Sequence, residues 1–588
     1  MDSKHVTEST SGQEDIQKTW WKEAIIYQIY PRSFQDSDGD GIGDLNGITS
    51  RLDYIQSLGV DIIWLNPIFL SPNDDNGYDI SDYREIMREF GTMEDFDRLL
   101  KEIHKREMRL VLDLVVNHTS DEHPWFEEAR KSRHNPYYNY YHWWPAEKGE
   151  PPLRLSYFDE EGNAWTYNKS TDSYYLHYFS RKQPDLNWEN PEVRQEIFDM
   201  MRFWFDKGID GFRMDSISLI AKDPSFPLID SKKYPDIFSF YAKEPRLHLY
   251  LHEMNRQVLS KYDCMSVGEG SAVMVDDVAK FVDPAREELN MLYHFDAARI
   301  RNTTLPDNPE SGIDYSLIAL KKMFTEWDKA VDKGWPSIYL GNHDQPRMVS
   351  RFGSDKDEFR ALSAKMLITF LLTMRGTPYW FAGDEIGMRN IRFDHIEDYN
   401  DIDTINRYKK AKAEGKDPQA VLDEQKETGR DNARTPFQWD RSPETGFTAG
   451  TPWLKVNPDY TWINVADEEK DPTSILNYFK KVVSFRKENP SLIYGSYHLL
   501  DAENPQCYTF LRKTGADTYL IMLNFSPKAA ISTPGIDMSN AHVLLDNYGD
   551  RSHMAPQKDI TLRPFEAIVF QLNHPVYESF IDSLDLLE

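Results

Sequence analysis

The chain has 588 residues, which is too long for one ordinary domain and predicts two or three. Hydrophobic residues make up 40% and aromatic residues 13%, which supports a large core and excludes global disorder. The formal net charge of −29 argues against nucleic acid or an anionic membrane as a partner, because either would repel this surface. A neutral sugar is compatible with it.

The N-terminal segment MDSKHVTESTSGQEDIQK is polar and acidic, and it lacks the apolar core of a signal peptide. We therefore expect a polar tail over residues 1–18. No stretch of the sequence reaches the roughly 18 apolar residues of a membrane span. Cys264 and Cys507 are the two cysteines of the chain, so no disulfide framework is implied. These features predict a cytoplasmic protein.

Apolar runs with strand character alternate with amphipathic helical patterns, which is typical of a parallel α/β fold. Eight such runs occur, at residues 24–31, 60–67, 109–117, 211–215, 265–269, 291–295, 337–342 and 377–382. Eight strand–helix repeats predict a (β/α)8 TIM barrel, here built from residues 19–117 and 187–505. Its active site is expected at the carboxyl ends of the strands.

Several intervening helices carry start and stop signals. Gly59 suits the end of the helix that follows the first strand. Thr92 and Asp95 form a plausible capping pair at the start of the next one. The helix before the fourth strand is predicted to begin at Asn190 and to end at Gly208.

Two inserted segments interrupt the strand–helix repeat, and a β-rich region follows it. Residues 118–186 are rich in Tyr, Trp, Pro and His without helical periodicity, which predicts an irregular inserted domain. A charged, partly helical segment, residues 390–440, follows the eighth strand. Residues 506–588 are expected to form a C-terminal antiparallel β domain with a short tail, with strands at 507–513, 518–525, 543–546 and 567–572.

The segment Gly211-Phe-Arg-Met-Asp-Ser216 places a basic residue two positions before a carboxylate. Two residues apart on a strand, Arg213 and Asp215 point to the same face. An arginine beside a carboxylate favours its ionised form, which suits a nucleophile rather than a proton donor. A structural Arg–Asp pair is the alternative interpretation of this segment alone.

Three other predicted strands end in a carboxylate or an imidazole: Asp113-Leu-Val-Val-Asn-His118, Ser266-Val-Gly-Glu269 and Gly341-Asn-His-Asp344. In this order the four segments resemble the α-amylase family of retaining glycosidases (glycoside hydrolase family thirteen). Two further segments, Gln183-Pro-Asp-Leu-Asn-Trp188 and Gly429-Arg-Asp-Asn-Ala-Arg-Thr-Pro-Phe-Gln-Trp439, resemble its oligo-1,6-glucosidase and α-glucosidase branch. The resemblance runs from about Trp20 to the C-terminus, and it implies the inserted domain after the third strand.

Retaining hydrolysis uses two carboxyl groups about 5 Å apart. The resemblance implies that Asp215 is the nucleophile and Glu269 the general acid. Glu269 follows apolar residues with no adjacent cation in the sequence, and such surroundings raise a carboxyl pKa. A third carboxylate, Asp344, is expected to accept hydrogen bonds from sugar hydroxyls and to favour the oxocarbenium-like state. For Glu269 and Asp344, a structural carboxylate is the alternative.

Other family positions imply contacts to the glucose unit that is cleaved. His118 and His343 match histidines that bind its hydroxyls, although such histidines can also be structural. Asp79 matches a carboxylate that grips the non-reducing end of the sugar. Arg430 matches the cationic partner of that carboxylate, which closes the pocket behind one glucose; Arg434 competes for this role. Tyr78 and Phe179 are candidate stacking surfaces, with core packing as the alternative.

An acidic loop follows the first predicted strand. Asp36, Asp38, Asp40 and Asp44 occupy positions one, three, five and nine of an EF-hand-like spacing, and Ile42 would supply a backbone oxygen. Position twelve is glycine rather than glutamate, and flanking EF helices are not evident. The loop instead resembles the single Ca²⁺ loop of this glucosidase branch. We expect a structural calcium ion, with a solvated acidic turn as the alternative.

These features predict a retaining, exo-acting α-glucosidase that acts on a small oligosaccharide. In the resembling branch, valine directly after the nucleophile accompanies α-1,6 preference, and smaller or hydroxylated residues accompany α-1,4 activity. Ser216 therefore leads us to expect maltose-type α-1,4 links, with possible α-1,6 and transglucosylation activity. Arg213 and Ser216 are both expected at the substrate.

Four alternatives remain on the same fold. The first is an oligo-1,6-glucosidase. A sucrose isomerase would carry an Arg-Leu-Asp-Arg-Asp run where this chain has Phe295-Asp-Ala-Ala-Arg-Ile-Arg-Asn302, so this alternative is disfavoured. A trehalose-phosphate hydrolase would need a phosphate-binding cationic cluster, and the sequence shows no such cluster. A non-catalytic barrel protein of amino-acid transporters is disfavoured because both catalytic carboxylates are retained.

Overall fold

The computed structural model describes residues 18–158, 162–234, 236–515, 517–539, 541–551 and 558–572. The predicted tail over residues 1–18 lies outside the described residues except for Lys18, and so does the predicted tail beyond residue 572. Within these ranges, none of the helices has the length and apolar character needed to cross a membrane.

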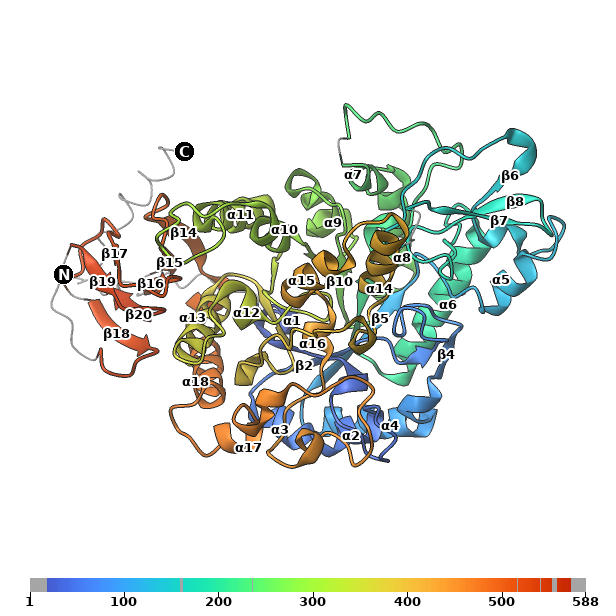
Figure 1. Cartoon of the computed structure of the whole chain (residues 1–588). Coiled ribbons are helices and arrows are strands. Elements are labelled where there is room, and N and C mark those ends of the chain that lie inside the picture. Colours follow the sequence, from blue (N-terminus) through green and yellow to red (C-terminus); the bar gives the residue numbers. More distant parts are fainter. Residues whose placement is uncertain are drawn as a thin grey trace, which may run out of the picture.

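An eight-stranded parallel sheet forms the centre of the molecule, in the order β11-β10-β9-β5-β2-β1-β13-β12 (Figure 1). At the open edge, the Ser337 hydroxyl on β12 donates to the carbonyl of Leu292 on β11 at 2.6 Å, so the sheet nearly closes. The predicted (β/α)8 barrel is confirmed. Its strands are β1 Ile26–Ile29, β2 Ile62–Leu65, β5 Arg109–Val115, β9 Gly211–Asp215, β10 Met265–Glu269, β11 Met291–Tyr293, β12 Ser337–Ile338 and β13 Thr377–Phe381.

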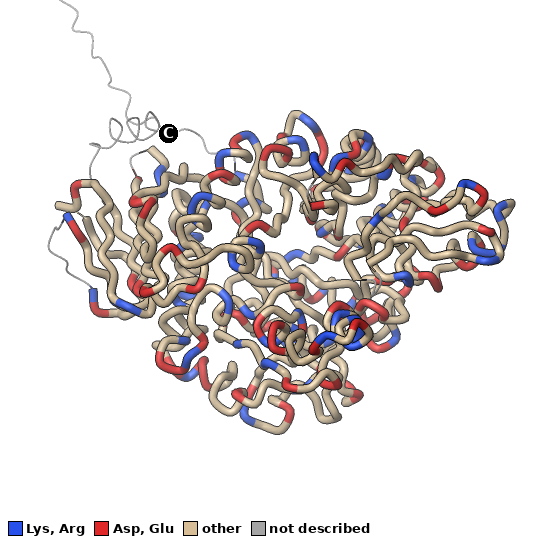
Figure 2. Tube along the Cα trace, turned by 45° about the horizontal axis from the view of Figure 1, so that its top comes forward, with Lys and Arg blue, Asp and Glu red and all other residues tan. Residues whose placement is uncertain are grey.

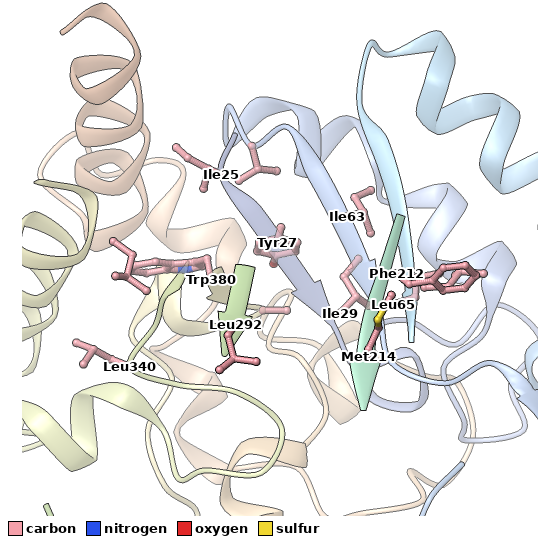
Figure 3. Close-up of a cluster of buried hydrophobic side chains, with 14 of the residues drawn as sticks. Ile25, Tyr27, Ile29, Ile63, Leu65, Phe212, Met214, Leu292, Leu340 and Trp380 are labelled. Atoms are coloured by element: carbon pink, nitrogen blue, oxygen red, sulfur yellow. The ribbon is translucent and has the colours of Figure 1, made fainter. Parts of the chain in front are cut away.

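Alternate residues of these strands belong to two separate apolar layers, one between the barrel and its helices and one inside the barrel. The first set faces the helices and includes Ile25, Tyr27 and Ile29 along β1, with Phe212 and Met214 on β9 (Figure 3). The second set fills the barrel interior: Ile26, Ile62, Trp64, Val111, Met265, Val267, Met291, Tyr293 and Tyr379. Because side chains alternate along a strand, any polar residue in phase with the second set lies inside the barrel.

Helices cover the outside of the barrel, and their predicted ends are largely confirmed. Thr92 and Asp95 cap α4 reciprocally. Asn190 caps α6, which ends at the left-handed Gly208. The predicted helix before Gly59 is divided into two short helices, because Arg51 leaves the helical conformation. The helices of this layer are α2 Leu45–Ser50, α3 Leu52–Ser57, α4 Met93–Lys105, α6 Pro191–Lys207, α8 Arg246–Gln257, α9 Ala279–Val282, α10 Asp296–Thr303, α11 Leu317–Ala330, α12 Met348–Phe352, α13 Arg360–Thr373, α17 Val465–Glu468, α18 Ile475–Glu488 and α19 Ser491–Tyr494.

Segments between the strands and helices build the rim of the barrel. The hairpin of β3 Phe69–Leu70 and β4 Asp82–Ile86 follows β2. The insertion after β5 contains α5 Pro124–Ala129 and a three-stranded antiparallel sheet of β6 Trp143–Pro145, β8 Ser173–Leu176 and β7 Trp165–Asn168, at the right of Figure 1. The segment after β13 forms α14 Ile402–Ala413, α15 Pro418–Thr428 and α16 Asp431–Arg434. The short helices α1 Trp20–Glu23 and α7 Phe238–Tyr241 complete the set.

The C-terminal domain is a five-stranded antiparallel sheet in the order β14-β15-β16-β20-β18, at the left of Figure 1. It begins at Ser496, because β14 pairs with β15 along its whole length, so the sheet starts before the predicted boundary at residue 506. Its strands are β14 Ser496–Leu500, β15 Cys507–Thr514, β16 Asp517–Asn524, β18 Ala541–Asp546 and β20 Ala567–Leu572; β17 Ala530–Ser532 and β19 Ile560–Leu562 form a separate pair. The four predicted strands are present. Acidic and basic residues are interspersed over the trace (Figure 2).

Candidate active site

A buried arginine joins the carboxylates of three neighbouring strands. The guanidinium Nη1 of Arg213 on β9 donates to Asp113 on β5 at 2.6 Å and to Asp215 at 2.9 Å. The parallel register pairs Asp113 with Arg213 and Val115 with Asp215. These residues are in phase with the interior layer, so the predicted common face of Arg213 and Asp215 is confirmed.

Glu269 is also in contact with Arg213, through Nη2. The prediction that this carboxyl has no adjacent cation is therefore wrong. Its physical reason is the strand register: Val267 pairs with Arg213, so the guanidinium reaches Glu269 from the neighbouring strand, a contact that the linear motif does not encode. Burial raises the pKa of Asp215, and the charge of Arg213 opposes that rise.

One cavity collects most of the predicted residues. It is lined by Asp75, Tyr78, His118, Phe158, Phe179, Asp215, Ser216, Glu269, Asp344 and Arg430. Ser216 adopts a left-handed backbone conformation with φ of 44°, which turns the chain at the end of β9. A wider vestibule shares Asp344 and Arg430 with the cavity; its other lining residues are Arg301, Asn302, Gln345, Asp403, Arg407, Glu424, Gln425 and Thr428.

The prediction for Asp79 is wrong in this structure, and Asp75 takes its place. Asp79 is fully buried, and its carboxylate accepts hydrogen bonds from the backbone N–H groups of Asp74 and Asp75 and from the Ser71 hydroxyl. These contacts use both oxygens to hold the turn. The same turn directs Asp75 to the cavity, 3.4 Å from Arg430.

Arg430, rather than Arg434, lines the cavity. Its Nη1 lies 3.2 Å from Asp344, opposite its contact with Asp75. Arg434 is buried behind this layer, where it donates to the backbone carbonyl of His343 at 2.9 Å and to Asp344 at 3.1 Å. Burial alone would raise the pKa of Asp344, but His343 and the surrounding arginines hold it well below its usual range.

The two histidines have different positions. His118 lines the cavity, and its Nε2 lies 3.0 Å from the carbonyl oxygen of Tyr78. His343 is fully buried beneath Tyr78, with ring centroids 5.2 Å apart, and is not among the lining residues. Burial lowers the pKa of His118 to about 4 and that of His343 to about 3, so both are neutral at pH 7. His343 acts on the cavity through Asp344, 3.2 Å from its Nε2.

Aromatic residues form one wall of the cavity. Tyr78 and Phe179 line it as predicted, and Phe158 joins them. The Arg430 guanidinium lies 4.9 Å from the centre of the Phe158 ring, a cation–π contact. Phe158 and Asp75 are the lining residues that the sequence reasoning missed. For Asp75 a signal was present, since the Asn-Asp-Asp run of residues 73–75 ends four positions before Asp79; for Phe158 no local pattern separates it from core aromatic residues.

The acidic loop brings together three of its four predicted carboxylate ligands. The carboxylate oxygens of Asp36, Asp38 and Asp40 lie within 4.8 Å of one another. The carboxylate of Asp44 instead caps α2 by accepting from the Gly47 N–H, and it also accepts from Ser37. The N–H of Ile42 donates to Asp40 at 2.8 Å. Clustered carboxylates are the hard oxygen ligands that Ca²⁺ prefers, so the donor set fits that ion.

An arginine-linked carboxylate pair at the carboxyl ends of a (β/α)8 barrel, with a third carboxylate lining the same pocket, defines a glycoside hydrolase site. The chain belongs to the α-amylase family (glycoside hydrolase family 13): residues 28–495 match the alpha-amylase catalytic domain.

Relatives of known name cover nearly the whole chain. It is 51% identical to the oligo-1,6-glucosidase of Parageobacillus thermoglucosidasius, over 95% of this chain and all of that protein. It is 43% identical to the trehalose-6-phosphate hydrolase of Bacillus subtilis, over 95% of this chain and 99% of that one. Among solved structures, the trehalulose synthase MutB of Pseudomonas mesoacidophila MX-45 superposes with a TM-score of 0.88 at 43% identity, over 94% of this chain and 99% of that one.

Proposed function

We propose that the chain is an exo-acting, retaining oligo-1,6-glucosidase, which releases glucose from the non-reducing end of short α-1,6-linked glucosides. The observation that carries this proposal is the 51% identity to an oligo-1,6-glucosidase over 95% of this chain and all of that protein. The sequence identity to the trehalose-6-phosphate hydrolase and to the trehalulose synthase is lower, at 43% each. The linkage expected from Ser216 alone, α-1,4, becomes the second candidate.

The closed end of the cavity supports exo action. Arg430 bridges Asp75 and Asp344 on one side of the pocket, while Glu269 and Asp215 lie on another. A sugar chain that reaches Asp215 and Glu269 would therefore also meet this charged group. Carboxylates and guanidinium groups can bind the hydroxyls of a terminal glucose with charge-assisted hydrogen bonds.

In the proposed reaction, Asp215 attacks the anomeric carbon while Glu269 gives its proton to the leaving oxygen. Water then hydrolyses the glucosyl–Asp215 ester, with Glu269 acting as the base, so that the configuration is retained. Asp344, held ionised by its arginine neighbours, would stabilise the positive charge that develops on the sugar ring. Arg213 would favour the charged form of Asp215 in the resting site.

A specific observation keeps α-1,4 activity as a second candidate. Ser216 lines the cavity directly beside the proposed nucleophile, and its hydroxyl hydrogen-bonds to the Asp215 carboxylate, so a small polar side chain stands where the second sugar would lie. The deciding experiment compares kcat/KM for isomaltose, maltose, sucrose and trehalose 6-phosphate, with the products identified. A strong preference for isomaltose with glucose as product is expected. Maltose preference would favour the second candidate, and isomerised sucrose or phosphate dependence would point to the other relatives.

We also propose that Asp36, Asp38 and Asp40 hold a structural Ca²⁺. The loop is tied to the segment after α16: the Asp36 N–H donates to the carbonyl of Phe447 at 3.0 Å, and the Trp453 N–H donates to that of Gly41 at 3.0 Å. An ion there would neutralise mutual repulsion among the carboxylates and strengthen this junction.

A further inference from the structure

Arg430 has a third carboxylate partner, which lies outside the cavity. Its Nε donates to Asp401 Oδ1 at 2.7 Å, and its Nη2 lies 2.5 Å from the same oxygen. These distances are shorter than those from Arg430 to Asp75 and Asp344, which are 3.4 Å and 3.2 Å. Asp401 is fully buried and is not among the residues that line the cavity.

The two oxygens of Asp401 have separate partners. Oδ2 caps α14 by accepting from the Thr404 N–H at 3.0 Å and from its hydroxyl at 2.7 Å. Oδ1 is thereby left to face Arg430. The Asp401 backbone N–H donates to Asp431 Oδ2 at 2.9 Å, which fixes the cap to the short helix that follows Arg430 in the chain. One carboxylate therefore connects the start of α14 to the closed end of the sugar pocket.

The charge at Asp401 is favoured by its surroundings. Burial would raise the pKa of Asp401, but Arg430 and Arg434 lower it below its usual value. Without that charge, Arg430 would retain Asp75 and Asp344 as its carboxylate partners, and it could shift toward either one. A shift toward Asp344 would weaken the charge that faces the substrate, and a shift toward Asp75 would open the wall.

We propose that Asp401 is a positioning residue that holds Arg430 between Asp75 and Asp344, so that the N-terminus of α14 sets the closed end of the substrate pocket. The inference rests on the proposed exo-acting function. It goes beyond that function because it assigns to Asp401, which does not line the pocket, an indirect effect on the binding of the terminal glucose.

The test is Asp401→Asn, which keeps the size and the capping ability of the side chain and removes its charge, since Asn and Asp are equally good caps. We expect KM to rise about tenfold or more, because the charge-assisted contact that aligns Arg430 loses its negative partner, with a smaller change in kcat. The matched control is Asp417→Asn, the same change at the cap of α15, where Asp417 accepts from the Gln419 N–H at 2.9 Å. The control should leave KM unchanged.

The same substitution is then made in an Arg430→Ala background. If Asp401 acts through Arg430, Asp401→Asn should add no further change in KM there. An unchanged KM in the single variant, or an equal increase in both backgrounds, overturns the proposal. The assay uses whichever glucoside the wild type cleaves best. A failure of the linkage proposal would thus change the substrate used, but not the ratios among variants.

Discussion

At the residue scale, the site depends on one guanidinium that holds three carboxylates from adjacent strands. Arg213 is fully buried between Asp113, Asp215 and Glu269, so these groups cannot reorient independently. A buried cation that loses one partner still has two. The geometry of the remaining pair should therefore survive the removal of either proposed catalytic carboxylate.

We expect Asp215→Ala and Glu269→Gln each to lower kcat by several orders of magnitude while the melting temperature stays close to that of the wild type. Each variant lacks one half of the double displacement. Azide should partly restore turnover of Asp215→Ala and yield a β-glucosyl azide, because a small anion can enter the vacated side. Steady-state kinetics on an activated α-glucoside and product analysis provide the measurement; near-normal activity of either variant would contradict the assignment.

Linkage choice should respond to Ser216. Valine at this position would add apolar, branched bulk beside the nucleophile, so Ser216→Val should reduce kcat/KM for maltose relative to isomaltose. One side chain in a pocket contributes about 1–3 kcal/mol of discrimination, or about 10- to 200-fold. Ser216→Ala, which removes the hydroxyl without adding bulk, separates the loss of a hydrogen bond from crowding. A ratio that stays constant in both variants would show that the vestibule sets linkage instead.

Much of the cavity could be predicted from the sequence. Asp215 and Glu269 end strands whose alternation places them inside the barrel, and most of the other lining residues match motif positions of the resembling family. The errors have two causes. Asp79 and Asp75 lie in one turn, and the choice between them depends on which carboxylate the turn itself consumes as a hydrogen-bond acceptor. The contact from Arg213 to Glu269 crosses between strands, and Phe158 reaches the cavity from the insertion. Neither relation is local in sequence.

At the scale of elements, boundaries were predictable where capping chemistry is local. The cap of α4 and the glycine end of α6 both rest on a few adjacent residues. By contrast, β14 lies before the predicted C-terminal domain, because its membership is set by antiparallel pairing with β15 rather than by a pattern of its own. The break at Arg51 is a further example, since the apolar spacing continues through it.

The acidic loop provides a prediction at this scale. Removing divalent ions with a chelator should lower the melting temperature, while activity at moderate temperature changes little. An ion that binds only the folded state stabilises it by mass action, by about 2.7 kcal/mol at a free concentration of 100 times Kd. Asp38→Asn should reduce the calcium-dependent part of the shift. Washed protein without bound calcium, together with a melting temperature that chelation does not move, would establish an unoccupied acidic turn.

At the scale of the whole molecule, the barrel and the C-terminal sheet are joined by buried arginines that bind backbone carbonyls. Arg512 on β15 donates to the carbonyls of Thr373 and Leu492 at 2.6 Å and 2.7 Å, and to those of Ile493 and Gly495 at 3.1 Å and 2.8 Å. Burial, with the nearby Arg486, lowers the pKa of Arg512 well below its usual value. The N–H groups of the guanidinium therefore stabilise the junction of α13, α19 and the sheet by hydrogen bonding to backbone carbonyls.

Arg512→Met should separate this structural role from catalysis. The apolar side chain fills part of the space but leaves three carbonyls without their arginine donor, while that of Leu492 keeps Arg486, and buried unsatisfied groups cost about 1–3 kcal/mol each. Removal of a buried charge relieves desolvation and offsets part of this loss, so we expect a net destabilisation of about 2–4 kcal/mol. Urea denaturation measures it, and Lys513→Met, on the next position of the same strand, is the control.

KM and kcat should remain those of the wild type, because these contacts lie in the junction and not in the cavity. A variant as stable as the wild type would mean that apolar packing alone joins the two domains.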